Sequence, residues 1–178
     1  SNPLELFQIW LNLPKAKKFA KPHFAMLWSE NIPKVISKDT NGKLTEVTVI
    51  AGKIAEVFAP KPAPDSWANE PGNEVGIWLI KMEVNAQWTI PAASLEVNRS
   101  LYFYRGTKIN ITGILIDNYH SVDLLADQTV IVENGDQEAF LLLLQGKPIN
   151  EPVVQHGPFV MNSADEIRQA FSDYRRTN

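Results

Sequence analysis

The stretch of sequence at residues 78–84 reads WLIKMEV, and it decides the fold class. Two sets of side chains alternate along it: Trp78, Ile80, Met82 and Val84 against Leu79, Lys81 and Glu83. Successive side chains of an extended chain point to opposite faces, so this period of two predicts a β-strand with one face in a core.

Similar patterns recur on both sides of this stretch. Alternating or compact β-type runs occupy residues 46–51, 109–112, 129–132 and 139–144. Turn signals lie near or between them: Asn41-Gly42, Arg105-Gly106, Asp117-Asn118 and Asn134-Gly135. Short strands with frequent turns predict an all-β, antiparallel sandwich or barrel. Residues 59–73 contain four prolines, which cannot donate to a strand ladder, so we expect a loop there.

The end of the chain has a helical pattern instead. Ser163 followed three residues later by Glu166 fits a capping box, in which each side chain satisfies a backbone N–H of the first turn. Apolar side chains then repeat at helical spacing: Ile167, Ala170, Phe171 and Tyr174. The pattern predicts one amphipathic helix over residues 163–178.

The beginning of the chain has apolar side chains at both odd and even positions. In residues 4–13, Phe7, Ile9 and Leu11 fall on one side of an extended chain, and Leu6 and Trp10 fall on the other. A strand that is apolar on both faces is normally buried on both. Residues 14–22 follow with four lysines between two prolines, which indicates an exposed connector.

Composition excludes several classes of protein. The 178 residues carry a net charge of −3, so no global positive field favours nucleic acid, and we expect no direct nucleic-acid binding. No apolar run approaches the length of roughly 18–20 residues that crosses a bilayer, so we expect no membrane span. The absence of cysteine excludes disulfides and thiolate metal sites, and we expect a cytoplasmic location.

Candidate catalytic residues are scarce. The three histidines, His23, His120 and His156, are too far apart in sequence to form a local metal pair. The carboxylates cluster in loops where they are expected to be solvated. We therefore predict no catalytic residue and no metal ligand in this chain.

Two segments carry a resemblance to a known family. Residues 7–14 (FQIWLNLP) are similar to the F-Q-L-W-x-N-L segment of the pirins. Residues 146–162 (GKPINEPVVQHGPFVMN), with Glu166-Ile167 after them, match the pirin run G-x-P-L-x-E-P-V-x-Q-x-G-P-F-V-M-N nearly position for position. Residues 47–52 resemble the strand V-x-V-I-A-G of the same family.

The resemblance implies the C-terminal half of a bicupin, a protein of two tandem cupin barrels with iron in the N-terminal one. It implies a cupin-type β-barrel or jelly roll with a C-terminal helix. We expect residues 1–14 to be a strand that belongs to or faces the N-terminal barrel. Residues 15–30 are then a linker, 31–162 the C-terminal barrel and 163–178 the helix.

The general cupin metal pattern can be laid on this chain. Counting back from Gly106 places Arg99 at the glutamate position and residues 92–95 at the histidine positions, and Val130 falls on the remaining histidine position. None of these side chains is a carboxylate or imidazole that binds iron. We therefore expect no cofactor in this chain, with iron in the N-terminal half.

The resemblance implies two activities for the whole protein: iron-dependent dioxygenation of quercetin, or redox-dependent regulation through a transcription factor or metabolic enzyme. For this chain we predict a non-catalytic scaffold whose partner is the N-terminal barrel, or a second copy paired through the N-terminal strand. Six residues are predicted to form the contact: Phe7, Ile9, Trp10, Gln155, His156 and Phe159. The alternative is a stand-alone small-molecule-binding barrel with a cavity lined by Trp78, Trp88, Tyr102 or Tyr104.

Overall fold

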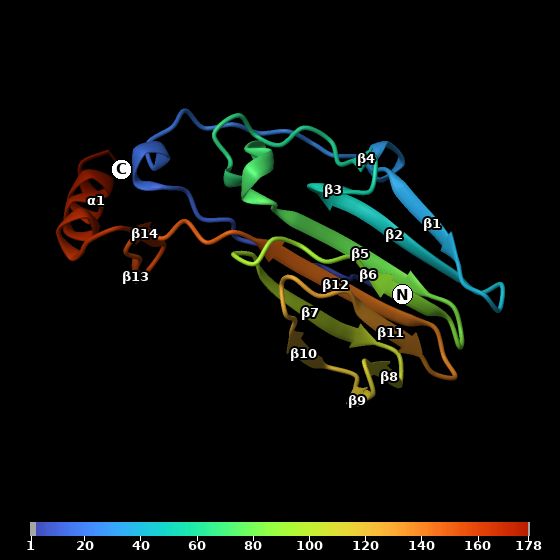
Figure 1. The fold of residues 1–178 in the computed structure, drawn as a ribbon. Coiled ribbons are helices and arrows are strands. Elements are labelled where there is room, and N and C mark those ends of the chain that lie inside the picture. The colour runs from blue at the N-terminus through green and yellow to red at the C-terminus, as the bar shows by residue number, and fades with distance from the viewer. Residues whose placement is uncertain (1–2, 178) are drawn as a thin grey trace. The chain divides into compact units, whose positions relative to one another are not determined.

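The computed structural model describes residues 3–177, which fall into two units (Figure 1). The barrel unit comprises residues 24–63 and 68–148. The terminal unit comprises, among the described residues, 3–23, 64–67 and 149–177. Both ends of the chain therefore belong to the same unit, separated in sequence by the barrel.

The barrel unit contains a six-stranded antiparallel sheet in the order β1-β2-β5-β12-β7-β10. The strands are β1 (Lys34–Lys38), β2 (Leu44–Ala51), β5 (Gly76–Met82), β12 (Ala139–Gly146), β7 (Asn98–Arg105) and β10 (His120–Asp123). In the central pair, Trp78 lies opposite Leu143 and Ile80 opposite Leu141. These residues are two positions apart on each strand, so their side chains share the face that the alternation predicts to be buried.

A second, four-stranded antiparallel sheet has the order β6-β11-β8-β9. Its strands are β6 (Gln87–Ile90), β11 (Val130–Asn134), β8 (Lys108–Ile111) and β9 (Ile114–Asp117). Thr112 and Gly113 join β8 to β9 with φ values of 49° and 91°. Positive φ at both residues is what a tight hairpin of matching twist requires.

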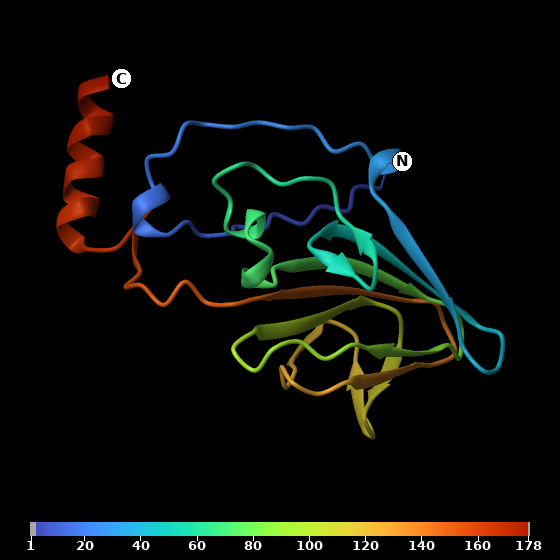
Figure 2. The same cartoon turned by 45° about the horizontal axis from the view of Figure 1, so that its top comes forward.

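The core of the barrel unit lies between these two sheets, which are stacked in Figure 2. Both sheets contribute fully buried side chains, among them Val49, Ile80, Leu141 and Leu143 from the first and Ile90, Ile109 and Val132 from the second. The predicted all-β antiparallel jelly roll is therefore confirmed. Shorter elements complete the unit: η2 (Ser29–Asn31), the hairpin β3 (Lys53–Ile54) and β4 (Val57–Phe58), and η4 (Pro71–Asn73), while η3 (Trp67–Asn69) crosses its boundary.

The terminal unit contains η1 (Lys15–Lys17), the hairpin of β13 (Val154–His156) and β14 (Phe159–Met161), and the helix α1 (Ala164–Thr177). The helix predicted over residues 163–178 is confirmed from Ala164 to Thr177, with Ser163 immediately before it, and residue 178 lies outside the described residues. Contacts group residues 149–162 with this helix, whereas the sequence placed them in the barrel. Across residues 3–177 no helix is both long enough and apolar enough to span a bilayer.

Of the strand predicted over residues 1–14, residues 1 and 2 lie outside the described residues, and residues 3–14 have no strand partner within this chain. These residues form no ladder with another strand and carry no regular secondary structure. Their alternating pattern favours an extended chain, but an extended chain becomes a strand only when a neighbour accepts its hydrogen bonds. A strand formed with a neighbouring N-terminal barrel therefore stays a prediction, and the segment is rich in exposed apolar side chains.

Candidate functional site

The hairpin β13–β14 and the helix α1 place two of the predicted contact residues together. The ring of Phe171 lies edge-on to His156 at 5.5 Å and to Phe159 at 4.9 Å between centroids. Phe159 also meets Tyr174 at 6.1 Å. The hairpin turns at Gly157, whose φ of 54° is one that residues with a side chain rarely adopt. An aromatic cluster thus fixes the hairpin against the helix.

The first turn of α1 is tied to the connector near the N-terminus. Glu166 accepts hydrogen bonds from the Lys15 ammonium at 2.8 Å and from the backbone N–H of Asn162 at 2.8 Å. Its own N–H donates to Ser163 Oγ at 3.2 Å. The hydrogen bond from Lys15 is the largest of the contacts that lower the pKa of Glu166, followed by that from Asn162. The predicted capping box is present, with its return bond moved from residue 163 to residue 162.

Glu151 strengthens the same junction. Its Oε2 atom accepts from the backbone N–H of Lys15 at 2.6 Å and from the Asn162 side chain at 2.9 Å. Both Glu151 and Asn162 belong to the seventeen-residue run on which the family resemblance rests. That run therefore holds the two ends of the chain in one unit.

The other predicted contact residues lie outside this aromatic cluster. Phe7, Ile9 and Trp10 are 40%, 36% and 65% exposed in a segment without regular structure. Gln155 is exposed on β13. The structure therefore brings together His156 and Phe159 but leaves these four residues on the surface.

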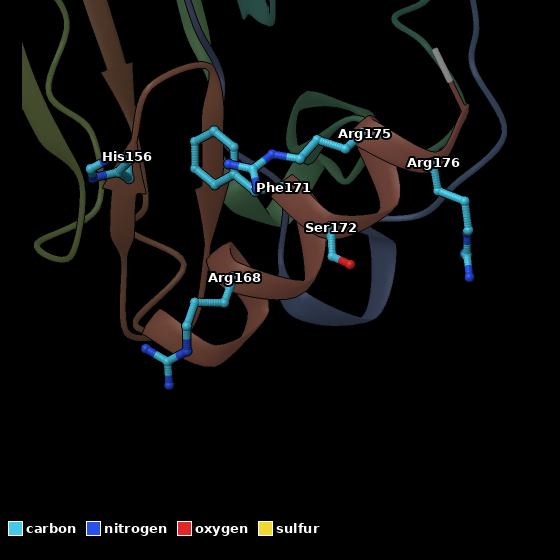
Figure 3. Close-up of a pocket in the computed structure, with 6 residues that line it drawn as sticks. All are labelled: His156, Arg168, Phe171, Ser172, Arg175 and Arg176. Carbon is cyan, nitrogen blue, oxygen red and sulfur yellow. The ribbon is translucent and has the colours of Figure 1, made fainter.

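A depression of about 640 Å³ lies beside the aromatic cluster (Figure 3). It is lined by His156, Arg168, Phe171, Ser172, Arg175 and Arg176. Arg168 pairs with Asp165, and Arg176 pairs with Asp173 at 3.0 Å, each one helical turn away. These are exposed pairs on a solvated helix face, and such pairs contribute little. The depression offers positive charge but no arrangement of groups for catalysis.

The positions of the cupin metal pattern do not fit iron. Arg99 on β7 is 3% exposed, and its cationic side chain stands where a glutamate ligand is required. Val130 offers a hydrocarbon side chain to the histidine position, and a buried guanidinium repels a divalent cation. Among residues 3–177 there is no group of three or more histidine, aspartate or glutamate side chains that could hold a metal ion. These two positions of the barrel therefore do not supply the ligands that the cupin metal pattern requires.

The barrel unit contains a cavity of about 590 Å³. Its walls come from the β3–β4 hairpin, residues 59–62 and 68–71, the start of β5, residues 91–93 and Gln145. Of the four aromatic residues proposed from the sequence, Trp78 lines this cavity, whereas Tyr104 stacks at a tilt on Phe140. The sequence did not locate the remaining walls, because a proline-rich loop shows no sign of what it covers.

Comparisons with known proteins relate this chain to one family. Residues 77–178 match the model of the Pirin C-terminal cupin domain. Pirin-1 of Arabidopsis thaliana is 33% identical over 94% of this chain and 55% of its own length. Human Pirin is 32% identical over 97% of this chain and 56% of its own length. A Pseudomonas aeruginosa protein provisionally named quercetin 2,3-dioxygenase is 30% identical over 95% of this chain and 57% of its own length.

A solved structure shares the fold. The crystal structure of quercetin 2,3-dioxygenase from Acinetobacter baumannii superposes with a TM-score of 0.76 at 22% identity, covering 93% of this chain and 53% of that one. The chain spans about half the length of the curated relatives it matches. The matched model covers more than half of the chain, and the chain therefore belongs to the pirin family through its C-terminal cupin domain.

Proposed function

We propose that this chain is the metal-free, scaffold half of a pirin-type bicupin, and that the terminal unit docks the iron-bearing N-terminal barrel. One observation carries this proposal: residues 4–10 present Leu4, Leu6 and Trp10 with 87%, 76% and 65% of their surface exposed. Fully burying a side chain of leucine size contributes roughly 1.5–3 kcal/mol, so a partner that covers these three gains several kcal/mol. Apolar side chains in such a row are seldom left in water.

The lengths of the relatives support the same proposal. The relatives extend well beyond the region that aligns with this chain. A second barrel of similar size accounts for the difference, and it is the half in which the family resemblance expects iron. The side chains at Arg99 and Val130 suit no divalent ion. They support the proposal that the N-terminal barrel binds the metal and this barrel does not.

For the whole protein we propose dioxygenation of quercetin, on the strength of the relative provisionally named for that reaction. In this assignment the chain supplies one wall of the cleft between barrels and no catalytic group. The test follows the loss of quercetin absorbance with iron-loaded full-length protein. No turnover, together with retention of a protein partner, would favour the regulatory role. A cytoplasmic location stays a prediction.

The docking proposal is tested by sedimentation velocity of this chain alone over a range of concentrations. We expect self-association, and we expect the double variant Leu6→Glu, Trp10→Glu to sediment as a monomer. Ile114→Glu is the matched control, because Ile114 is also 65% exposed but lies on β9 of the barrel unit. A native chain that is monomeric throughout, with residues 4–13 protected from hydrogen exchange, would contradict the proposal.

A further inference from the structure

Arg99 is a buried cation without a carboxylate partner. It is 3% exposed, and its guanidinium donates four hydrogen bonds. The acceptors are Gln145 Oε1 at 3.1 Å and the backbone oxygens of Pro91 at 2.8 Å, Ala126 at 3.2 Å and Gln128 at 3.4 Å. All four are neutral.

The guanidinium of Arg99 is therefore hydrogen-bonded, but no negative charge balances its positive charge. A guanidinium has five N–H groups and stays protonated at neutral pH. Across the described part of the chain, no carboxylate lies within salt-bridge distance of it. Buried charges are normally paired with an opposite charge. A ligand that carries a negative charge would supply the missing partner of Arg99.

Two of the four acceptors connect Arg99 to the cavity of the barrel unit. Pro91 and Gln145 both line that cavity, and both hold the guanidinium. The volume of about 590 Å³ lies within the range of roughly 300–1,000 Å³ that is typical of small-molecule sites. The cation thus lies directly behind the cavity wall.

The Gln145 side chain in the cavity wall is held in one orientation. Gln145 Nε2 donates to the backbone oxygen of Glu74 at 3.4 Å while its Oε1 accepts from Arg99. A Cβ atom at Gly76 would stand 2.9 Å from Gln145 Cγ, so a side chain at residue 76 would force Gln145 to shift. Both ends of the Gln145 amide are therefore in use, and its orientation is set by the protein.

Glu74, an acidic residue of the lining, has partners other than Arg99. The carboxylate of Glu74 accepts from the Ser94 hydroxyl and from the Ser94 backbone N–H at 3.1 Å, and it faces the Lys147 ammonium at 3.6 Å. Lys53, Glu56, Lys61 and Glu70 also line the cavity, so its remaining charges are mixed. Lys53 and Lys61 are exposed to solvent, whereas Arg99 is buried.

The rest of the lining suits an apolar body. It includes Ile54, Phe58, Pro60, Val75, Trp78 and Ala93. Trp78 is almost fully buried, and its Nε1 atom has no hydrogen-bond acceptor among residues 3–177. Flat aromatic and proline surfaces favour a flat ligand, and an unused indole N–H favours one that carries acceptors.

We propose that this cavity binds a small monocarboxylate with a flat apolar body, whose carboxylate compensates the charge of Arg99 at the wall formed by Pro91 and Gln145. The apolar body lies against Phe58 and Trp78. This site does not depend on the docking role proposed above, because every residue in it belongs to the barrel unit.

The test is calorimetric titration of the purified chain with 2-naphthoate and with 2-naphthamide, a neutral ligand of nearly the same shape. We expect the acid to bind about tenfold more tightly than the amide or better, since only the acid carries a negative charge that the buried Arg99 guanidinium attracts across the cavity wall. Equal affinity for the two ligands, or no heat from either at millimolar concentration, would overturn the proposal.

Variants locate the site. Arg99→Met should remove the preference for the acid, whereas Arg99→Lys should keep part of it. Ala92→Phe, at an exposed alanine of the cavity rim, should block both ligands, and Leu125→Phe, outside the cavity, should block neither. If Arg99→Met does not fold, the acid–amide comparison on the native chain and Ala92→Phe decide. An acid preference that survives Arg99→Met in folded protein, or binding that survives Ala92→Phe, contradicts the site.

Discussion

The barrel unit and the terminal unit differ in how many apolar side chains they bury. The barrel unit holds nearly all of the buried apolar side chains of the described residues, while the terminal unit contributes Ile167. Both units also expose large apolar side chains, such as Leu4, Leu6 and Phe19 in the terminal unit and Leu95 and Ile114 in the barrel unit. The barrel therefore has its own core, whereas the terminal unit depends on hydrogen bonds, a small aromatic cluster and, in our proposal, a partner.

The largest effect is expected from a truncation in the barrel core. Leu143→Ala should lower the free energy of unfolding by roughly 2–5 kcal/mol, because Leu143 is fully buried and leaves a cavity. Urea denaturation followed by fluorescence measures this loss.

The matched truncation in the terminal unit is Phe171→Ala. It should release the hairpin and helix locally and leave the barrel transition nearly unchanged, since Phe171 contacts His156 and Phe159 in its own unit. If Phe171→Ala lowered the free energy of unfolding of the barrel as much as Leu143→Ala does, the two units would unfold as one.

A glycine in the barrel gives the next effect. Gly52→Ala should destabilise the chain by roughly 2–3 kcal/mol, because the new Cβ would stand 2.0 Å from the backbone oxygen of Val75 and φ is +77°. Gly72→Ala is the control, since nothing lies within 4 Å of its added Cβ. Thermal melts of both variants test this difference. Equal melting temperatures would show that residue 52 does not lie close to the backbone oxygen of Val75.

A smaller effect is expected at the start of α1. Ser163→Ala should cost about 1 kcal/mol of helix stability, because the N–H of Glu166 loses its acceptor. Hydrogen exchange at residues 164–168 should accelerate. Ser172→Ala, within the helix, should leave hydrogen exchange in this turn unchanged. A similar acceleration of exchange in both variants would show that Ser163 does not act as a specific helix cap.

The smallest effect concerns pH. The Glu166 pKa lies below its ordinary value of 4.5, so the stability that this carboxylate contributes is present above that value and is lost as pH falls through the folded pKa. Titration by NMR should give a low midpoint that rises toward 4.5 in Lys15→Met. A midpoint that Lys15→Met leaves unchanged would show that the Lys15 contact is absent in solution.

The sequence predicted the barrel well because its signals are local. The alternation at residues 78–82 and the compact run at 139–144 reflect side chains that face one core, and β5 and β12 pair there. The helix could also be predicted, because Ser163 and Glu166 act within one turn.

Features that depend on distant partners could not be predicted in the same way. Residues 4–13 carry the pattern of a buried strand, yet strand formation needs a neighbouring ladder that this chain does not provide. Arg99 was identified as a substitution at a metal position, but its four acceptors are contributed by residues 8 to 46 positions away. Only the folded chain reveals that they surround a buried charge beside a cavity.

We propose that this barrel holds no iron and serves as the scaffold of the pair. The most direct test is elemental analysis of the purified chain after anaerobic incubation with ferrous salt and gel filtration. We expect far less than one iron per chain, with no change in Arg99→Met. One iron per chain, coordinated by side chains of this polypeptide, would contradict it.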